Sequence, residues 1–390
     1  MALPPDFSLQ EYLFDLPEER IAQTPAPHRA DSRLMVLRNQ GEGVTIARFS
    51  DILSFLPEKC LLVANNSRVV PARLTGHRQG GGKLEFLLLS PLPLLEANPL
   101  PPEAVLPGWK LAEAQCLLRP AKKVRIGEVI SFGCDMGIEV LEKGEFGQAR
   151  IKLAWQGDLL SLFERYGSPP LPPYIKRGSG SSGADNAGLG VKPTEGGEGL
   201  LDRERYQTVY ARREKSGSVA APTAGLHFTP ELRDALKRSG REWTELTLYV
   251  GYGTFSPVRC EDIREHAMHA EYVELPEESA AAIARAKAEG RAVIAVGTTS
   301  CRALEGIWAA GQGRGDALLP FSGWVNHFLY PGKPFNVIDG MITNFHLPGS
   351  SLLMLVSGLA GRERILEAYR EAVARDFRFF SYGDSMLILR

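Results

Sequence analysis

Two histidines of this chain lie in loops rich in proline or glycine, each shortly after an apolar run. His227 occurs in SVAAPTAGLHFT and His346 in MITNFHLPGS. The imidazole suits proton transfer because its pKa lies closest to neutral pH. A lone histidine is more often structural, but two in equivalent loops make both of them candidates for acid–base catalysis. The sequence leaves open which one is the base and which the acid.

Five apolar, strand-like runs end in compact polar clusters. CLLVA leads into NNSR, SVAA into PTAGLHFT, LTLYV into GYGTF, VIAV into GTTSCR, and MI into TNFHLPGS. In open parallel sheets, ligands bind at the carboxyl ends of the strands, so these clusters predict one shared pocket. Polar turns after strands would explain the glycines, but they do not require arginine or histidine. The residues expected to converge are Asn65, Arg68, Thr223, His227, Gly253, Thr254, Thr299, Arg302, Asn344 and His346.

Two of these clusters have the composition of ligand-binding loops. GTTSCR places Thr298, Thr299 and Ser300 where a helix begins, and free N–H groups and hydroxyls there suit a carboxylate or phosphate oxygen. A plain helix cap explains any single hydroxyl equally well. In GYGTF, Gly251 and Gly253 allow the backbone to approach a ligand closely. A dinucleotide fingerprint and a Walker phosphate loop are both missing from the sequence.

A metal-dependent hydrolase is the alternative raised by EHAMHAEY, where His266 and His269 are flanked by Glu265 and Glu271. The spacing differs from HExxH and no cysteines cluster nearby, so a hydrogen-bonding face is the favoured interpretation. No metal is expected. A GxSxG nucleophile elbow is also missing.

Composition predicts an ordinary globular chain whose cysteines are reduced. The 390 residues are 44% hydrophobic, enough for two domains. The N-terminus lacks a secretory signal, and five scattered cysteines without a CxxC pair favour a cytoplasmic location. SLLMLVSGLAG is too short for a bilayer span and predicts a buried helix. No membrane association is expected.

The pattern of predicted secondary structure changes twice along the chain, which predicts a discontinuous domain. Residues 1–68 and 156–390 alternate strand-like and helix-like segments, as in TPELRDALKRSG and PEESAAAIARAKAEG, and predict a largely parallel α/β sheet. Residues 69–155 contain only short strand-like runs, such as KLEFLLL and ARIKLAW, and predict an inserted sandwich or small barrel. The Gly/Ser-rich stretch 178–199 is expected to be a flexible loop.

The motifs together resemble the S-adenosylmethionine:tRNA ribosyltransferase-isomerase family of queuosine biosynthesis. The resemblance covers nearly the whole chain and rests on DLPEERIAQ, SRLMVL, NNSRVVPARL, RYQTVYA, VAAPTAGLHFT, VGYGTFSPV, HAEY, VGTTSCRALE, TNFHLPGSSLLMLVS and FRFFSYGDSMLI, which occur in the family's order. It implies a Rossmann-like three-layer domain with an inserted closed β-barrel.

The resemblance also implies the reaction. The ribosyl part of S-adenosylmethionine moves to 7-aminomethyl-7-deazaguanine at the tRNA wobble position, giving epoxyqueuosine, adenine and methionine. S-adenosylmethionine is consumed as a substrate, so no cofactor is expected. A base must remove a proton beside the sulfonium, and departing adenine needs a proton donor. The expected substrate-binding residues are Asn65, Arg68, Thr223, Gly225, Gly253, Thr254, Thr298, Thr299, Ser300, Arg302, Asn344 and Asp384, with His227 and His346 catalytic.

The tRNA is a polyanion, whereas the net charge of the chain is −1, so a local basic surface must bind it. Lys122, Lys123 and Arg125 of RPAKKVR are the predicted phosphate contacts, although short basic runs are usually ordinary surface charge. The chain is expected to act as a monomer. Two further candidate functions are a tRNA methyltransferase that uses S-adenosylmethionine and a non-catalytic RNA-binding protein.

Overall fold

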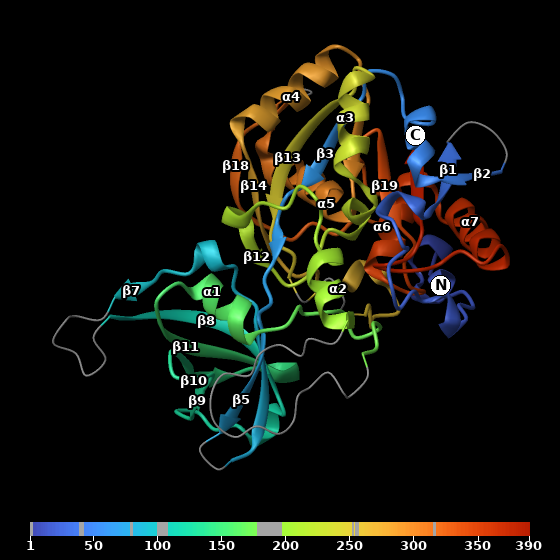
Figure 1. Ribbon diagram of the computed structural model, residues 1–390. Helices are drawn as coiled ribbons and strands as arrows, with labels where there is room; N and C mark the ends of the chain where they lie inside the picture. Colours follow the sequence, from blue (N-terminus) through green and yellow to red (C-terminus); the bar gives the residue numbers. More distant parts are fainter. Residues whose placement is uncertain are drawn as a thin grey trace. The chain divides into compact units, whose positions relative to one another are not determined.

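The computed structural model describes residues 3–38, 43–78, 81–99, 108–177, 197–251, 253, 257–314 and 317–390. They form two compact units (Figure 1). The α/β unit comprises Met1–Asn66, Thr208–Ala211 and Pro222–Arg390, and the barrel unit comprises Ser67–Gln207 and Arg212–Ala221. Thr254 and residues 178–196 of the predicted flexible loop lie outside the described residues.

The α/β unit is built on a nine-stranded mixed sheet. Its order is β18 (Phe321–Val325), β14 (Glu271–Leu275), β13 (Glu242–Leu248), β3 (Leu61–Asn65), β15 (Val293–Val296), β19 (Gly340–Asn344), β20 (Ser385–Leu389), β1 (Arg33–Arg38) and β2 (Thr45–Arg48). The four central strands β13, β3, β15 and β19 are parallel. β20 runs antiparallel to β19, and β14, β18 and β2 add antiparallel edges. β1 and β20 form a further parallel pair, so the predicted α/β class is confirmed with a mixed sheet.

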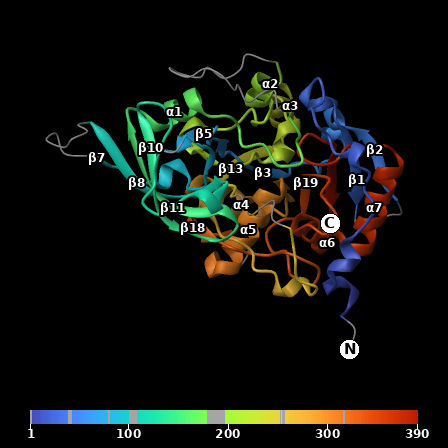
Figure 2. The same ribbon diagram turned by 90° about the horizontal axis from the view of Figure 1, so that it is seen from below.

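Helices cover both faces of this sheet (Figure 2). On one face, α3 (Pro230–Arg238) and the 3₁₀ turn Phe49–Ser54 pack their apolar residues against Leu62, Ala64, Ile294 and Ile342. On the other face, α4 (Glu277–Ala288) and α5 (Thr298–Ile307) contact the central strands. The result is the three-layer arrangement that the sequence predicted.

The apolar run after His346 forms the buried helix α6 (Ser351–Ala360), against which α7 (Arg362–Ala374) packs. The Ser350 side chain caps α6 by accepting a hydrogen bond from the N–H of Leu353 at 3.2 Å. The predicted buried helix is confirmed. Across the described part of the chain, every helix is too short or too polar to cross a membrane.

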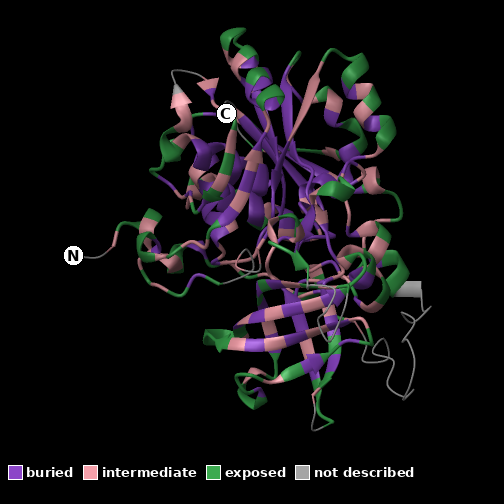
Figure 3. Cartoon of the chain, turned by 90° about the vertical axis from the view of Figure 1, so that its left-hand side faces the viewer, coloured by how far each residue is buried: buried purple, intermediate pink, exposed green. Residues whose placement is uncertain are grey.

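The barrel unit closes six antiparallel strands into a ring. These are β5 (Arg73–Arg78), β6 (Lys83–Leu88), β8 (Trp109–Arg119), β11 (Gln148–Gln156), β10 (Met136–Lys143) and β9 (Val129–Ser131), and β9 pairs with β5 again. Along β11, Ala149, Ile151, Leu153 and Trp155 are buried and alternate with more exposed residues (Figure 3). This period of two fills the barrel interior with apolar side chains. The predicted inserted barrel is confirmed.

The barrel unit is longer than the predicted 69–155 module. Helix α1 (Leu159–Tyr166) follows the last strand, and its Leu162 and Phe163 belong to the same apolar core. Helix α2 (Gly197–Arg205) and the strand pair β4 (Arg68–Val69) and β12 (Ser216–Ser218) also lie within the unit. The barrel unit therefore includes segments whose sequences do not show the strand pattern of the barrel, and tertiary packing places them in it.

Candidate active site

The carboxyl ends of the central strands bring several of the predicted residues together. β3, β15 and β19 are adjacent and parallel, so their ends lie at one edge of the sheet. Asn65 ends β3, Thr298 follows β15 by one glycine, and Asn344 ends β19. A 3₁₀ turn, Thr223–His227, contacts β19, and its Thr223 is half-buried.

His227 is held between two side chains. Its Nδ1 lies 2.7 Å from Oγ of Ser32, and its Nε2 lies 3.2 Å from Nδ2 of Asn344. The Phe49 ring packs on the imidazole with centroids 5.0 Å apart, and His227 is only 4% exposed. Both ring nitrogens are therefore occupied, and the ring orientation is fixed.

The contacts of Asn344 determine the tautomer of His227. The Asn344 Nδ2 also donates to the backbone carbonyl of Phe380 at 3.0 Å, which requires the amide nitrogen to be on that side. The Asn344 N–H therefore donates to Nε2 of His227, and the imidazole proton resides on Nδ1 and faces Ser32. Burial lowers the pKa of His227 to about 3. The imidazole is neutral at pH 7.

The N-terminus of α5 presents unpaired donors at the same edge. Gly297 precedes the helix with a φ of 94°, which favours glycine. Within the described chain, no backbone acceptor faces the N–H groups of Thr298, Thr299 and Ser300. The buried hydroxyl of Thr299 likewise lacks a described hydrogen-bond partner, whereas Ser300 Oγ donates to the Val296 carbonyl at 2.9 Å. A Cβ placed on Gly297 would lie 3.6 Å from that of Ala224, so the His227 turn adjoins this helix end.

A buried ion pair joins α5 to the first residue of β14. Arg302 Nη1 lies 2.7 Å from Oε2 of Glu271, and both side chains are at most 5% exposed. The Gly251 N–H donates to Glu271 Oε1 at 2.9 Å, and His269 Nε2 lies 3.5 Å from the same oxygen. Burial opposes ionisation of Glu271, but the charge of Arg302 and the hydrogen bonds from its neighbours lower its pKa to about 2. The carboxylate is therefore ionised and engaged.

Steric crowding explains why two of the predicted loop positions are occupied by glycine. A Cβ on Gly253 would lie 2.4 Å from the His269 ring, and one on Gly225 would lie 1.9 Å from the Tyr210 hydroxyl. Both positions are therefore restricted to glycine by packing against a neighbouring ring.

His346 lies apart from the His227 network. Its Nε2 is 2.9 Å from Oγ1 of Thr343, and its backbone N–H donates to the Tyr369 hydroxyl at 3.1 Å. Successive side chains of a strand point to opposite faces, so Thr343 and Asn344 direct these two histidines to opposite sides of β19. Burial lowers the pKa of His346 to about 3. The structure thus does not join the two predicted catalytic imidazoles in one contact network.

Two predicted substrate-binding residues have intramolecular partners. Asn65 donates to the Leu248 carbonyl at 2.9 Å and accepts from its N–H at 3.0 Å, which extends the pairing of β3 with β13. Asp384 accepts from the backbone and guanidinium of Arg33 and from the N–H of Arg378. These contacts give both residues a role in the fold.

The remaining predicted residues belong to the barrel unit. Arg68 Nη2 lies 3.7 Å from Oε1 of Glu164. Lys122, Lys123 and Arg125 are exposed, and the Arg125 N–H donates to Glu128 at 2.9 Å.

Ser32 and Glu271 were not among the predicted site residues. Each had a signal in the sequence, because Ser32 opens SRLMVL and Glu271 lies in HAEY. Their partners are 195 and 31 residues away, which no local pattern indicates. In the region that the structure describes, no group of three or more His, Cys, Asp or Glu residues is arranged to hold a metal ion.

Comparison with known proteins assigns the family. A family profile described as Queuosine biosynthesis protein matches residues 9–388. The S-adenosylmethionine:tRNA ribosyltransferase-isomerase of Nitratidesulfovibrio vulgaris strain DP4 is 56% identical over 386 residues and 98% of each chain. That of Natranaerobius thermophilus is 45% identical over 97% of this chain and 99% of its own. The crystal structure of S-adenosylmethionine tRNA ribosyltransferase from Thermotoga maritima is 30% identical, covers 98% of this chain and 100% of its own, and has a TM-score of 0.49. Because the profile and the curated relatives span almost its full length, the chain belongs to the S-adenosylmethionine:tRNA ribosyltransferase-isomerase family of queuosine biosynthesis, as its motifs predicted.

Proposed function

We propose that this chain transfers and isomerises the ribosyl moiety of S-adenosylmethionine onto 7-aminomethyl-7-deazaguanine at the wobble position of tRNA. The products are epoxyqueuosine-tRNA, adenine and methionine. Family membership over residues 9–388 is the observation that carries this assignment. S-adenosylmethionine is a substrate here, and the chain needs no further cofactor.

The N-terminus of α5 is the proposed site for the methionine carboxylate. Three free N–H groups and the positive end of a ten-residue helix favour an anion there. The buried hydroxyl of Thr299 adds one donor without a described partner. Arg302 contributes less directly, because its charge is already opposed by Glu271.

His227 is the proposed proton-transfer residue. Its Nε2 accepts a hydrogen bond from Asn344, and a substrate group can take the place of Asn344 as the donor. Its Nδ1–H is held by Ser32. A neutral imidazole has the free lone pair that a base requires, and the sulfonium of the substrate acidifies the adjacent C–H that the base deprotonates. The base and acid roles remain unassigned between His227 and His346. We place His346 second, since the described hydrogen bond of its imidazole is with Thr343, three residues away on the same segment.

The barrel unit is the proposed tRNA-binding part of the chain. It carries 21 Lys and Arg against 17 Asp and Glu, whereas the α/β unit carries 24 against 29. A polyanion is therefore attracted to the barrel unit and repelled by the other. Lys122, Lys123 and Arg125 are proposed phosphate contacts. We further propose that the chain acts in the cytoplasm and as a monomer.

One assay tests the function. The chain is incubated with S-adenosylmethionine and tRNA carrying the aminomethyl-deazaguanine base, and the products are separated by chromatography. Release of adenine and methionine together with a new nucleoside supports the proposal. S-adenosylhomocysteine without free adenine would identify a methyltransferase. Retention of tRNA with no consumption of the donor would identify a binding protein, and loss of activity with a chelator would identify a metal enzyme.

A further inference from the structure

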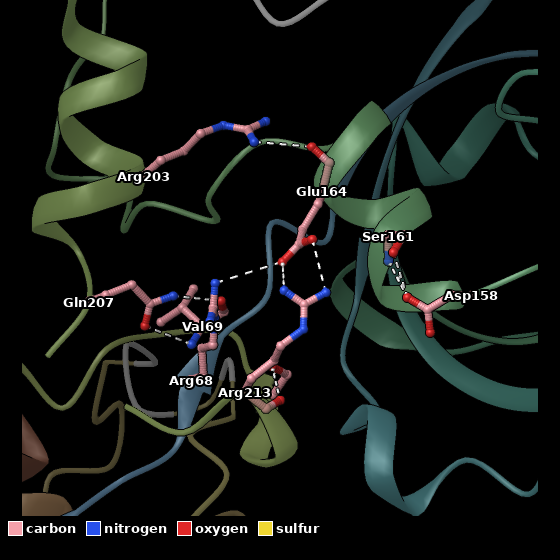
Figure 4. Close-up of polar contacts among 9 residues, drawn as sticks. Arg68, Val69, Asp158, Ser161, Glu164, Arg203, Gln207 and Arg213 are labelled. Atoms are coloured by element: carbon pink, nitrogen blue, oxygen red, sulfur yellow. Dashed lines mark hydrogen bonds and ion pairs between the residues drawn. The ribbon is translucent and has the colours of Figure 1, made fainter. Parts of the chain in front are cut away.

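Two arginines of the barrel unit contact the Glu164 carboxylate on helix α1, and a third arginine contacts the backbone carbonyl of the same residue (Figure 4). Nη1 and Nη2 of Arg213 each lie 3.3 Å from an oxygen of Glu164, and Arg68 Nη2 lies 3.7 Å from Oε1. Arg203 of α2 donates to the Glu164 carbonyl at 3.1 Å and to the Gly167 carbonyl. We call Arg68, Arg203, Arg213 and Glu164 the Glu164 cluster. It contains three positive charges and one negative charge.

The ratio of positive to negative charges in this cluster differs from that of the other ion pairs described in the barrel unit. Arg78 pairs with Glu128 and Arg165 with Asp135, one cation to one anion. Arg150 shows the reverse balance, because it lies between Glu113 and Glu142. Among the ion pairs described in this unit, Glu164 is the carboxylate that two arginines contact, and Arg203 adds a third positive charge beside it. Glu214, next to Arg213 in sequence, and Asp158, with which Arg213 interacts electrostatically, reduce this positive excess.

Backbone hydrogen bonds hold the arginines in place while their side chains stay reachable. Gln207 accepts from the Val69 N–H at 3.1 Å and donates to the Val69 carbonyl at 2.7 Å, which fixes the strand that carries Arg68. Ser216 Oγ donates to the Arg213 carbonyl at 2.6 Å. The side chains of Arg68 and Arg213 are 34% and 56% exposed. Preorganised and accessible guanidiniums lose little entropy on binding a ligand.

We infer that the Glu164 cluster binds a phosphate of the substrate RNA backbone, which rests on the proposed function. The guanidinium fork matches phosphate oxygens in a bidentate manner. Of the two substrates, the RNA is the anion. S-adenosylmethionine carries a sulfonium, an ammonium and one carboxylate, so its net positive charge is repelled by three arginines. Glu164 orders the guanidiniums when RNA is absent.

The test compares Arg213→Ala with Arg150→Ala, a matched control on the same unit that also removes a doubly contacted arginine. Binding of labelled tRNA is measured by fluorescence anisotropy at several salt concentrations. Arg213→Ala should weaken binding roughly tenfold at low salt. It should also flatten the slope of log K against log salt by about 0.7–0.9. Arg150→Ala should change neither, and Arg213→Lys should keep the slope while losing part of the affinity. Thermal melting confirms that each variant is folded.

Steady-state kinetics separate this inference from the proposed function. Arg213→Ala and Arg68→Ala should raise KM for tRNA and leave KM for S-adenosylmethionine unchanged. Glu164→Gln should steepen the salt slope, because it removes the competing carboxylate. An Arg213→Ala variant that binds tRNA like Arg150→Ala, or one that raises KM only for the donor, overturns the inference. A wild-type chain that binds tRNA but releases no adenine overturns the proposed function instead, and the salt series still tests the cluster.

Discussion

The side-chain amide of Asn344 donates to Nε2 of His227 at 3.2 Å across 117 residues of sequence. The same amide nitrogen is held by the carbonyl of Phe380, whose φ of 74° is unusual for a non-glycine residue. The geometry keeps the imidazole neutral, with its proton toward Ser32. Each of these groups comes from a different segment of the α/β unit.

His227→Ala should lower turnover by about 10²–10⁴-fold, because it removes a proton-transfer group. His346→Ala should reduce turnover less, and it should lower the melting temperature because it removes a buried imidazole that contacts Oγ1 of Thr343. Adenine release and thermal melting are measured for both variants. Full activity in His227→Ala would show that this histidine has only a structural role.

Stability should fall as the pH falls below about 6.5. The pKa values of His227 and His346 are near 3 in the folded chain and near 6.5 in the unfolded chain. Between these values the unfolded state binds more protons, so protonation favours unfolding. Each histidine contributes a slope of up to about 1.4 kcal/mol per pH unit. Urea titrations between pH 7 and 5 measure this slope, and His346→Gln should make it shallower. A slope for His346→Gln identical to that of the wild type would contradict the lowered pKa of His346 in the folded chain.

Breaking the buried Arg302–Glu271 pair should cost about 3–5 kcal/mol of unfolding free energy, because an uncompensated charge stays buried. Arg302→Met and Glu271→Gln each test this by denaturant titration. The double variant Glu271→Leu/Arg302→Met should be less destabilised than the sum of the two single variants. Additive effects would show that the two side chains are not coupled.

Gly253→Ala should destabilise the chain by about 1–3 kcal/mol, because the new methyl meets the His269 ring. Gly251→Ala is the matched control, since the nearest atom to its methyl is 3.8 Å away. The melting temperatures of both variants are compared with wild type. Equal effects in the two would mean that the His269 ring moves aside without cost.

Lys122→Ala/Lys123→Ala should weaken tRNA binding and flatten its salt dependence by about 0.7–0.9 for each phosphate that the variant no longer neutralises. Affinity for S-adenosylmethionine should be unchanged, because the proposed donor site is on the α/β unit. Fluorescence anisotropy and KM values provide the two measurements. An unaltered salt slope would make these lysines ordinary surface charge.

Local patterns in the sequence were sufficient to predict the principal elements. Thr229 and Pro230 mark the start of α3, and the Thr229 side chain accepts from the Leu232 N–H at 3.2 Å. The run ARIKLAW was predicted to be a strand and forms most of β11. Caps and periodicity act within a few residues, so they survive without tertiary information. The family motifs supplied the closed barrel and the reaction, which periodicity alone does not determine.

Contacts at the sheet edge depended on the tertiary structure. Apolar runs followed by polar clusters predicted the strand ends, but pairing alone decided that β19 lies between β15 and β20. That order brings Asn344 to His227, while the adjacent Thr343 directs His346 to the other face. The tertiary structure also brings Ser32 and Glu271 into the site. The ion pair between residues 31 apart and the hydrogen bond between residues 195 apart are set by strand order and side-chain direction, which no short window of sequence contains.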